Sequence, residues 1–197
     1  AVGVFLNVPN LEALERIRTG LDQLTLRGSL AIFLRTSSSA VEESAVRILA
    51  HDDITVRRGD AVSNVMALFD WADEVDFGRF DLVLSIGDFS GGRRVNAWLD
   101  SRTAFYLGNL VADDGDLDAV IQRFQDPAVD MVMSPASPYL EGVEDVFWAK
   151  NQIEARRMAK ALGLANSVVD EPSNLHAPHG LFWMRGRAAS DLAAAFA

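Results

Sequence analysis

Stretches typical of β-strands alternate along this sequence with stretches of helical periodicity. The expected strands are Val2–Val8, Ser29–Arg35, Asp53–Arg57, Phe80–Ile86, Val129–Ser134 and Gly180–Arg185. The expected helices are Leu11–Leu24, Val41–Leu49, Val62–Phe69, Arg94–Leu107, Leu117–Phe124, Val143–Leu164 and a last one from about Arg187. Such alternation predicts an α/β fold, with a mainly parallel sheet and helices on both of its faces.

The sequence is expected to form one α/β domain over residues 1–197, because it contains no internal repeat, low-complexity tract or obvious linker. It does not begin with Met, and its final helical pattern stops without a cap. A domain excised from a longer protein would explain both ends.

The charge and the missing cysteines exclude several classes of protein. A formal net charge of −10 argues against nucleic-acid binding, which needs a basic surface. The absence of cysteine excludes disulfides, thiolate nucleophiles and cysteine-bound zinc, and is consistent with a cytoplasmic location. No apolar run is long enough to span a membrane, so no transmembrane segment is expected.

The tip of the fourth expected strand carries the first candidate site. The apolar run of Phe80–Ile86 predicts a buried central strand, and Gly87 and Asp88 follow it directly. Open α/β sheets bind ligands just beyond the carboxyl ends of their strands, which makes Asp88 a candidate. The alternative is that Asp88 only starts a turn.

The tip of the third expected strand carries a second candidate loop, in which Arg58, Gly59 and Asp60 precede a helix. Backbone N–H groups and arginines at such a place can bind a phosphate. The alternative is a turn glycine with solvated charges, and the Arg-Gly-Asp order also allows an integrin-binding interpretation, which the acidic, cysteine-free composition disfavours.

Histidines and acidic residues give weaker signals. His176 and His179 could serve as a general base or as metal ligands, or they could be solvated loop histidines. The aspartates around Gly115 lack the spacing of a calcium loop. Rossmann, P-loop and serine-hydrolase fingerprints are missing.

Several of these segments resemble the rhamnan synthesis protein F family of glycosyltransferase-like proteins. The segment Arg58–Leu68 resembles the family's Arg-Gly-Arg-Asp-Val-Ala-Pro-Phe region, with Asp60 at the aspartate. The segment Phe147–Leu164 resembles its Trp-Gly-Gly-Asn helix, and His179–Arg185 resembles Ala-Gly-Ser-Met-Phe-Trp-Ala-Arg. The residues that match one by one are Asp60, Trp148, Asn151, Phe182 and Trp183.

The resemblance implies a GT-A-like architecture, a nucleotide-activated sugar as donor, such as rhamnose or another deoxyhexose, and a glycan acceptor in bacterial cell-surface polysaccharide synthesis. Asp88 and His179 would be catalytic, and Asp88 could bind a divalent metal such as Mg²⁺ or Mn²⁺. The expected nucleotide-sugar-binding residues are Arg58, Gly59, Asp60, Asn64, Asn151 and Trp183. Other domains of a longer protein would be partners.

The chain departs from the family where the family carries histidines and a lysine. Phe5 and Asn7 replace the histidines of the first strand, and Ser85, Gly87 and Phe89 stand at the tip of the fourth. These departures favour the alternative function, a non-catalytic domain of a polysaccharide-assembly protein that binds a glycan or a partner.

Overall fold

The computed structural model describes residues 1–25, 28–60, 64–87, 105–111, 114–134, 152–161 and 180–196. The chain divides into two compact units, residues 1–133 with 177–197, and residues 134–176. The second unit contributes one described helix, α6 (Gln152–Ala161). The single domain expected from the sequence stays a prediction.

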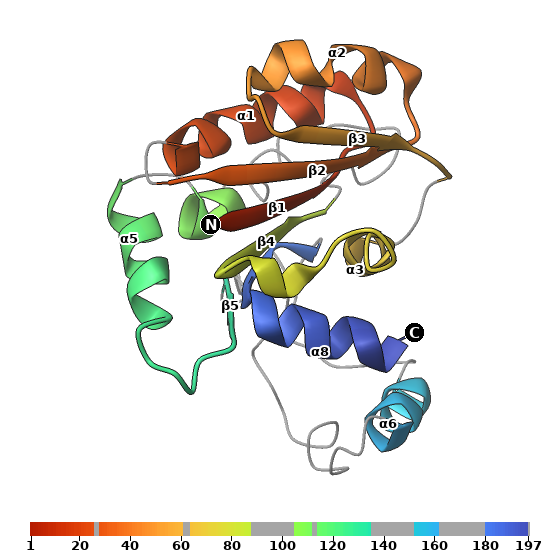
Figure 1. Cartoon of the computed structure of the whole chain (residues 1–197), viewed down its shortest axis with the longest axis vertical. Coiled ribbons are helices and arrows are strands. Elements are labelled where there is room, and N and C mark those ends of the chain that lie inside the picture. The colour runs from red at the N-terminus through yellow and green to blue at the C-terminus, as the bar shows by residue number, and fades with distance from the viewer. Residues whose placement is uncertain are drawn as a thin grey trace. The chain divides into compact units, whose positions relative to one another are not determined.

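The first unit is built on a six-stranded sheet with the order β3-β2-β1-β4-β6-β5 (Figure 1). The strands are β1 (Val2–Asn7), β2 (Leu30–Thr36), β3 (Ile54–Arg58), β4 (Leu82–Ile86), β5 (Met131–Met133) and β6 (Phe182–Arg185). The pairs among β1 to β4 are parallel, whereas β6 runs antiparallel to both β4 and β5.

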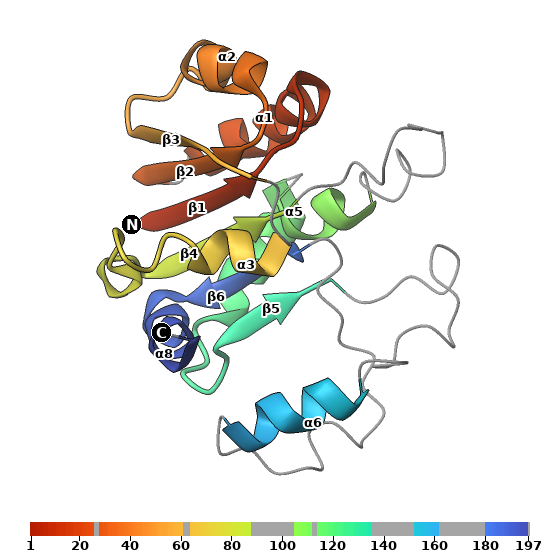
Figure 2. The ribbon, with the colours of Figure 1, turned by 90° about the vertical axis from the view of Figure 1, so that its right-hand side faces the viewer.

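Helices of the first unit lie along the strands on both faces of the sheet (Figures 1 and 2). They are α1 (Leu11–Thr25), α2 (Ser39–Leu49), α3 (Asn64–Phe69), the short 3-10 helix η1 (Phe77–Arg79), α5 (Asp114–Arg123) and α8 (Gly186–Phe196). Residues 105–110 are also helical. The predicted α/β class, with a mainly parallel sheet and helices on both faces, is confirmed.

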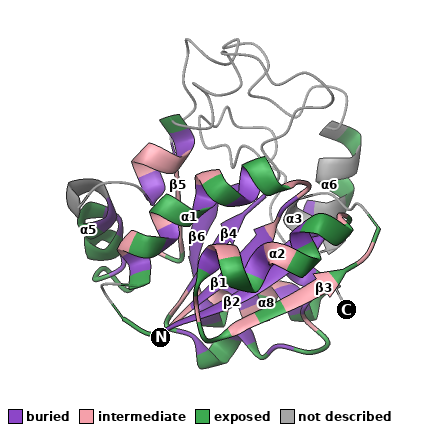
Figure 3. Cartoon of the chain, turned by 90° about the horizontal axis from the view of Figure 1, so that it is seen from above, coloured by how far each residue is buried: buried purple, intermediate pink, exposed green. Residues whose placement is uncertain are grey.

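Side chains that alternate along each strand supply two separate cores. The even-numbered residues of β1 and β2, such as Val4 and Ile32, pack with the apolar stripes of α1 and α2. The odd-numbered residues, such as Phe5 and Phe33, pack with α3, η1 and α8 on the other face. The central strands are therefore buried on both faces, as their continuous apolar sequences predict (Figure 3).

Aromatic rings fill much of the second core. The ring of Phe5 stacks on Phe33 with their centroids 4.8 Å apart, and the ring of Phe77 meets Phe5 edge-on at 5.1 Å. Trp71, directly beyond α3, lies edge-on to Phe33 at 5.4 Å. Such offset and edge-on pairs add stability beyond the burial of apolar area and help to fix η1 and the end of α3 against the sheet.

Candidate functional site

The strand order creates one point at which the connections of the sheet diverge. From β1 the chain passes through α1, β2 and α2 to β3, and both of these helices pack on the same face. It then returns through α3, on the opposite face, to β4 on the other side of β1. The carboxyl ends of β1 and β4 therefore flank a topological switch point, the usual ligand-binding position in an open α/β sheet.

The described residues at this edge follow from the register. Leu6 of β1 pairs with Ile86 of β4, and Gly87 follows Ile86 at the same edge. On the other side of β1, Asn7 pairs with Arg35 of β2, which in turn pairs with Arg57 of β3. Asp88, the candidate that comes directly after Gly87 in the sequence, lies outside the described residues.

The predicted loop of Arg58, Gly59 and Asp60 lies at the same carboxyl edge, but its three residues have different surroundings. Arg58 is exposed and pairs with Glu42 of α2, with 3.4 Å between nitrogen and oxygen. The backbone N–H of Gly59 donates to the carbonyl of Thr36 at 3.0 Å. The side chain of Asp60 is exposed, so Asp60 is the member of this loop whose carboxylate faces solvent.

Arg35 is a part of this edge that the sequence analysis missed. It is only 7% exposed, and its Nη2 donates to the carbonyl of Asp60 at 3.0 Å. A Cβ at Gly59 would lie 2.9 Å from the same nitrogen, so a larger residue there would displace the guanidinium. Arg35 therefore holds the Gly59–Asp60 backbone against the end of β2. The sequence does not predict this role, because an arginine that follows an apolar run is typical of the solvated end of a strand.

Acidic residues beyond α3 neutralise the two arginines of β2 and β3. Arg35 forms an ion pair with Asp70, and Arg57 forms one with Glu74. Arg57 also donates to the backbone carbonyl of Asp70 at 2.9 Å, and its guanidinium lies 4.2 Å from the ring centroid of Trp71. The two cations are thus already engaged by two carboxylates and an aromatic face.

The prediction for Trp183 needs correction. This side chain is 0% exposed in the core beneath α1, and its indole N–H donates to the carbonyl of Leu110 at 2.9 Å. Strand alternation turns Trp183 into the sheet interior, so it stabilises the fold and has no surface to offer a sugar.

Of the other predicted site residues, only Asn64 is among the residues that the structure describes. Asn64 is the first residue of α3, so its backbone is at the start of that helix. Asn151 and His179, like Asp88, lie outside the described residues. Among the residues that are described, no group of three histidine, aspartate or glutamate side chains comes together to hold a metal.

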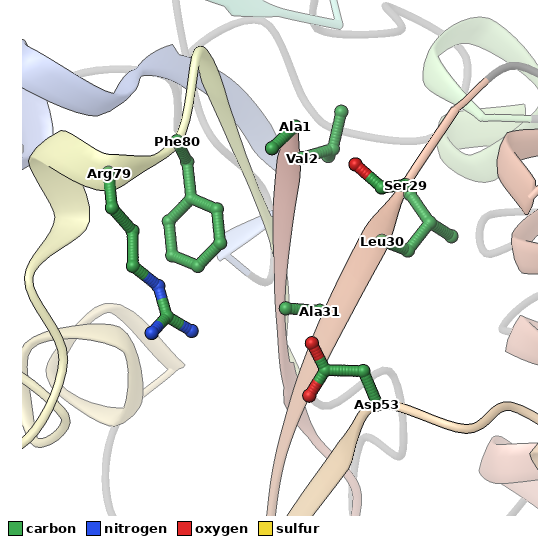
Figure 4. Close-up of a pocket in the computed structure, with 8 residues that line it drawn as sticks. All are labelled: Ala1, Val2, Ser29, Leu30, Ala31, Asp53, Arg79 and Phe80. Carbon is green, nitrogen blue, oxygen red and sulfur yellow. The ribbon is translucent and has the colours of Figure 1, made fainter.

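A cavity of about 290 Å³ lies at the opposite end of the strands. The first residues of β1 and β2 line it together with Asp53, Arg79 and Phe80 (Figure 4). The sequence analysis singled out none of these residues, because the positions before strands carry no motif and their convergence depends on strand order.

The comparisons with known proteins add no relative. No protein-family model matches the chain, and no curated protein is significantly similar to it.

Among the described helices, none has the length and apolar character needed to cross a membrane.

Proposed function

We propose that this chain is a glycosyltransferase-like domain that binds a nucleotide-activated sugar, such as an activated rhamnose or another deoxyhexose, for bacterial cell-surface polysaccharide synthesis. The observation that supports this proposal is the switch point between β1 and β4, which opens at the carboxyl edge just before Asp88. A diphosphate at this edge would lie within the part of an α/β sheet that most often binds ligands.

The proposed chemistry assigns different roles to the residues of this edge. Transfer of a sugar needs a group that accepts the proton of the acceptor hydroxyl, and Asp88 or His179 is the proposed base. The leaving diphosphate needs positive charge, for which Arg58 is the exposed arginine of the Gly59–Asp60 loop. A divalent metal at Asp88 would supply further charge when bound, but the described residues contain no group of three possible ligands, so no step is derived through a metal.

The ion pairs of the arginines favour a second function. In this alternative the chain is a non-catalytic domain that binds a glycan or a partner protein. Arg35 and Arg57 are neutralised by Asp70 and Glu74, and Arg58 pairs with Glu42. An incoming diphosphate would have to compete with these carboxylates, whereas a neutral glycan would leave the ion pairs intact.

Calorimetric titration with a panel of nucleoside diphosphates and nucleoside diphosphate sugars tests the site. We expect at least one to bind, and we expect Asp60→Ala and Asp88→Ala to change its affinity by about tenfold, since each carboxylate would face the ligand or its metal. Asp22→Ala on the exposed side of α1 is the matched control and should leave the affinity unchanged. The site assignment fails if no member of the panel binds, or if the three variants behave alike.

Donor hydrolysis separates the two functions. A transferase is expected to release the sugar slowly into water and to lose this activity in the Asp88→Ala variant. A binding domain would show glycan binding without any turnover of the donor. Turnover that persists unchanged in the Asp88→Ala variant would contradict the catalytic role of this residue.

A further inference from the structure

The cavity at the amino ends of the strands is lined by an arginine, an aspartate and apolar side chains, and the terminal ammonium of Ala1, which also lines it, is paired with Asp81. Arg79 and Asp53 lie on either side of it, with the ring of Phe80 beside Arg79 and the side chain of Ala31 beside Asp53 (Figure 4). We propose that this cavity binds a small zwitterion, a molecule that carries one carboxylate and one ammonium group, as an amino acid does. The proposal is independent of the proposed transferase function, which concerns the opposite edge of the sheet.

The guanidinium of Arg79 is positioned beside two aromatic rings and could bind a carboxylate. Its guanidinium carbon lies 4.6 Å from the ring centroid of Phe80 and 5.6 Å from that of Phe33. These cation–π contacts hold the guanidinium beside the two rings, and its N–H groups can still donate to a planar oxyanion. Within the described part of the chain, no carboxylate pairs with this group, although the protein carries an excess of acidic residues.

Asp53 supplies the complementary charge. Its backbone is held from two sides, since its N–H donates to Nδ1 of His51 at 3.3 Å and its carbonyl accepts from the N–H of Ile32 at 2.9 Å. The side chain is exposed, and the described residues offer its carboxylate no partner. A ligand ammonium group would therefore meet an exposed carboxylate on a backbone that is held in place.

Charge and size select the class of ligand. A phosphate or dicarboxylate would bind Arg79 but would be repelled by Asp53 and by the net charge of −10. A simple amine would lack a partner for Arg79. The volume of about 290 Å³ falls at the lower limit of small-molecule sites, which agrees with a ligand of amino-acid size.

Amide NMR titration with a series of amino acids of increasing length tests the proposal. The probes are glycine, β-alanine, γ-aminobutyrate and δ-aminovalerate, with butylamine, butyrate and inorganic phosphate as controls. We expect one length to bind best, at millimolar concentration, and to shift the amides of residues 29–31, 53 and 79–80. Each control probe should bind at least about tenfold more weakly, because it leaves one charged group of the cavity without a partner.

Variants make the test specific. Asp53→Asn and Arg79→Gln should each weaken binding by about tenfold, and Arg79→Lys should weaken it less, since it keeps the charge but loses the planar fork. Arg47→Gln on α2, where the guanidinium donates to the Ser44 hydroxyl at 3.4 Å, is the control and should bind like the parent. The proposal is overturned if no zwitterion shifts these amides, if phosphate binds as well as the best zwitterion, or if the folded Asp53→Asn variant binds unchanged.

Discussion

At the scale of single residues, Gly186 shows how closely the start of α8 approaches η1. Its N–H donates to the carbonyl of Asp81 at 3.2 Å, which ties the helix to the beginning of β4. A Cβ at this position would collide with the carbonyl oxygen of Phe80 and would lie 2.5 Å from that of Phe77. Backbone atoms on both sides cannot move as a flexible side chain could, so the position requires glycine.

We therefore expect Gly186→Ala to lower the free energy of unfolding by about 1–3 kcal/mol, or more if α8 has to shift. Gly108→Ala is the matched control, because Gly108 lies within helical residues and no atom approaches the added Cβ within 4 Å. The control should leave stability unchanged or raise it by up to about 1 kcal/mol, because alanine favours the helix. Urea unfolding of both variants checks the difference, and equal stabilities would contradict the close approach at Gly186.

The residue scale also shows why the candidate site could be predicted only in part. Asp60 could be found because it stands in a loop beside a glycine and arginines, and its carboxylate is exposed. Arg35 could not, because its importance depends on pairing with Asp70, which is far away in the sequence. The family resemblance predicts that Trp183 binds the ligand, although a tryptophan in an apolar run is usually part of the core, and the structure buries it completely.

At the scale of elements, α2 is defined by its two caps. At its start the hydroxyl of Ser38 accepts from the N–H of Val41 at 3.4 Å, which is a common role of serine before a helix. At its end Ala50 adopts a left-handed conformation with φ 48° and ψ 40°, and its N–H donates to the carbonyl of Val46 at 3.0 Å. Left-handed backbone is unfavourable for a residue with a Cβ, and glycine is the usual residue in such a cap.

Ala50→Gly should therefore raise the free energy of unfolding by about 0.5–1 kcal/mol, because the relieved strain outweighs the greater freedom of glycine in the unfolded chain. Ala40→Gly in the exposed first turn of the same helix is the control and should lower it by about 1 kcal/mol. Thermal unfolding of the two variants should give opposite shifts of Tm. A loss of stability in both would show that Ala50 does not carry the strain.

Elements were predictable from the sequence where their pattern is local. The strands and helices of the first unit lie within a few residues of their expected ranges, apart from the helix expected over Arg94–Leu107, most of which lies outside the described residues. Alternation, helical periodicity and caps are properties of short segments. The antiparallel direction of β6 was not predictable, since it depends on how the chain returns to the sheet after β5. The position of the cavity at the amino ends could not be foreseen either, because it depends on the strand order and not on a local pattern.

At the scale of the first unit, the sheet order places β1 and β4 in the middle. Each has a hydrogen-bonded strand on both sides, β1 between β2 and β4, and β4 between β1 and β6. Both are also covered on their two faces by the helices of the two cores. The edge strands differ, because β3 contains only half-buried and exposed residues and β5 has only three residues.

This arrangement predicts a gradient of local stability across the sheet. Amides of β1 and β4 should exchange with solvent only through global unfolding, whereas hydrogen-bonded amides of β3 and β5 should exchange faster through local opening. The carboxyl edge would then have a rigid side at β1 and β4 and a more mobile side at β3, where the Gly59–Asp60 loop begins. Such a division suits a ligand site, since the switch point stays fixed while the loop can adjust to what binds there.

Native-state hydrogen exchange measures this gradient directly. The expected result is that exchange in β1 and β4 responds to denaturant with the slope of global unfolding, while exchange in β3 and β5 depends little on it. The Ala50→Gly variant serves as an internal check. An increase in its global free energy of unfolding should raise the free energy of opening of the β1 amides by the same amount. If β3 is protected as strongly as β1, then the carboxyl edge is uniformly rigid, and a ligand would have to fit the Gly59–Asp60 loop as it stands, against the carboxylates that already neutralise Arg35 and Arg57.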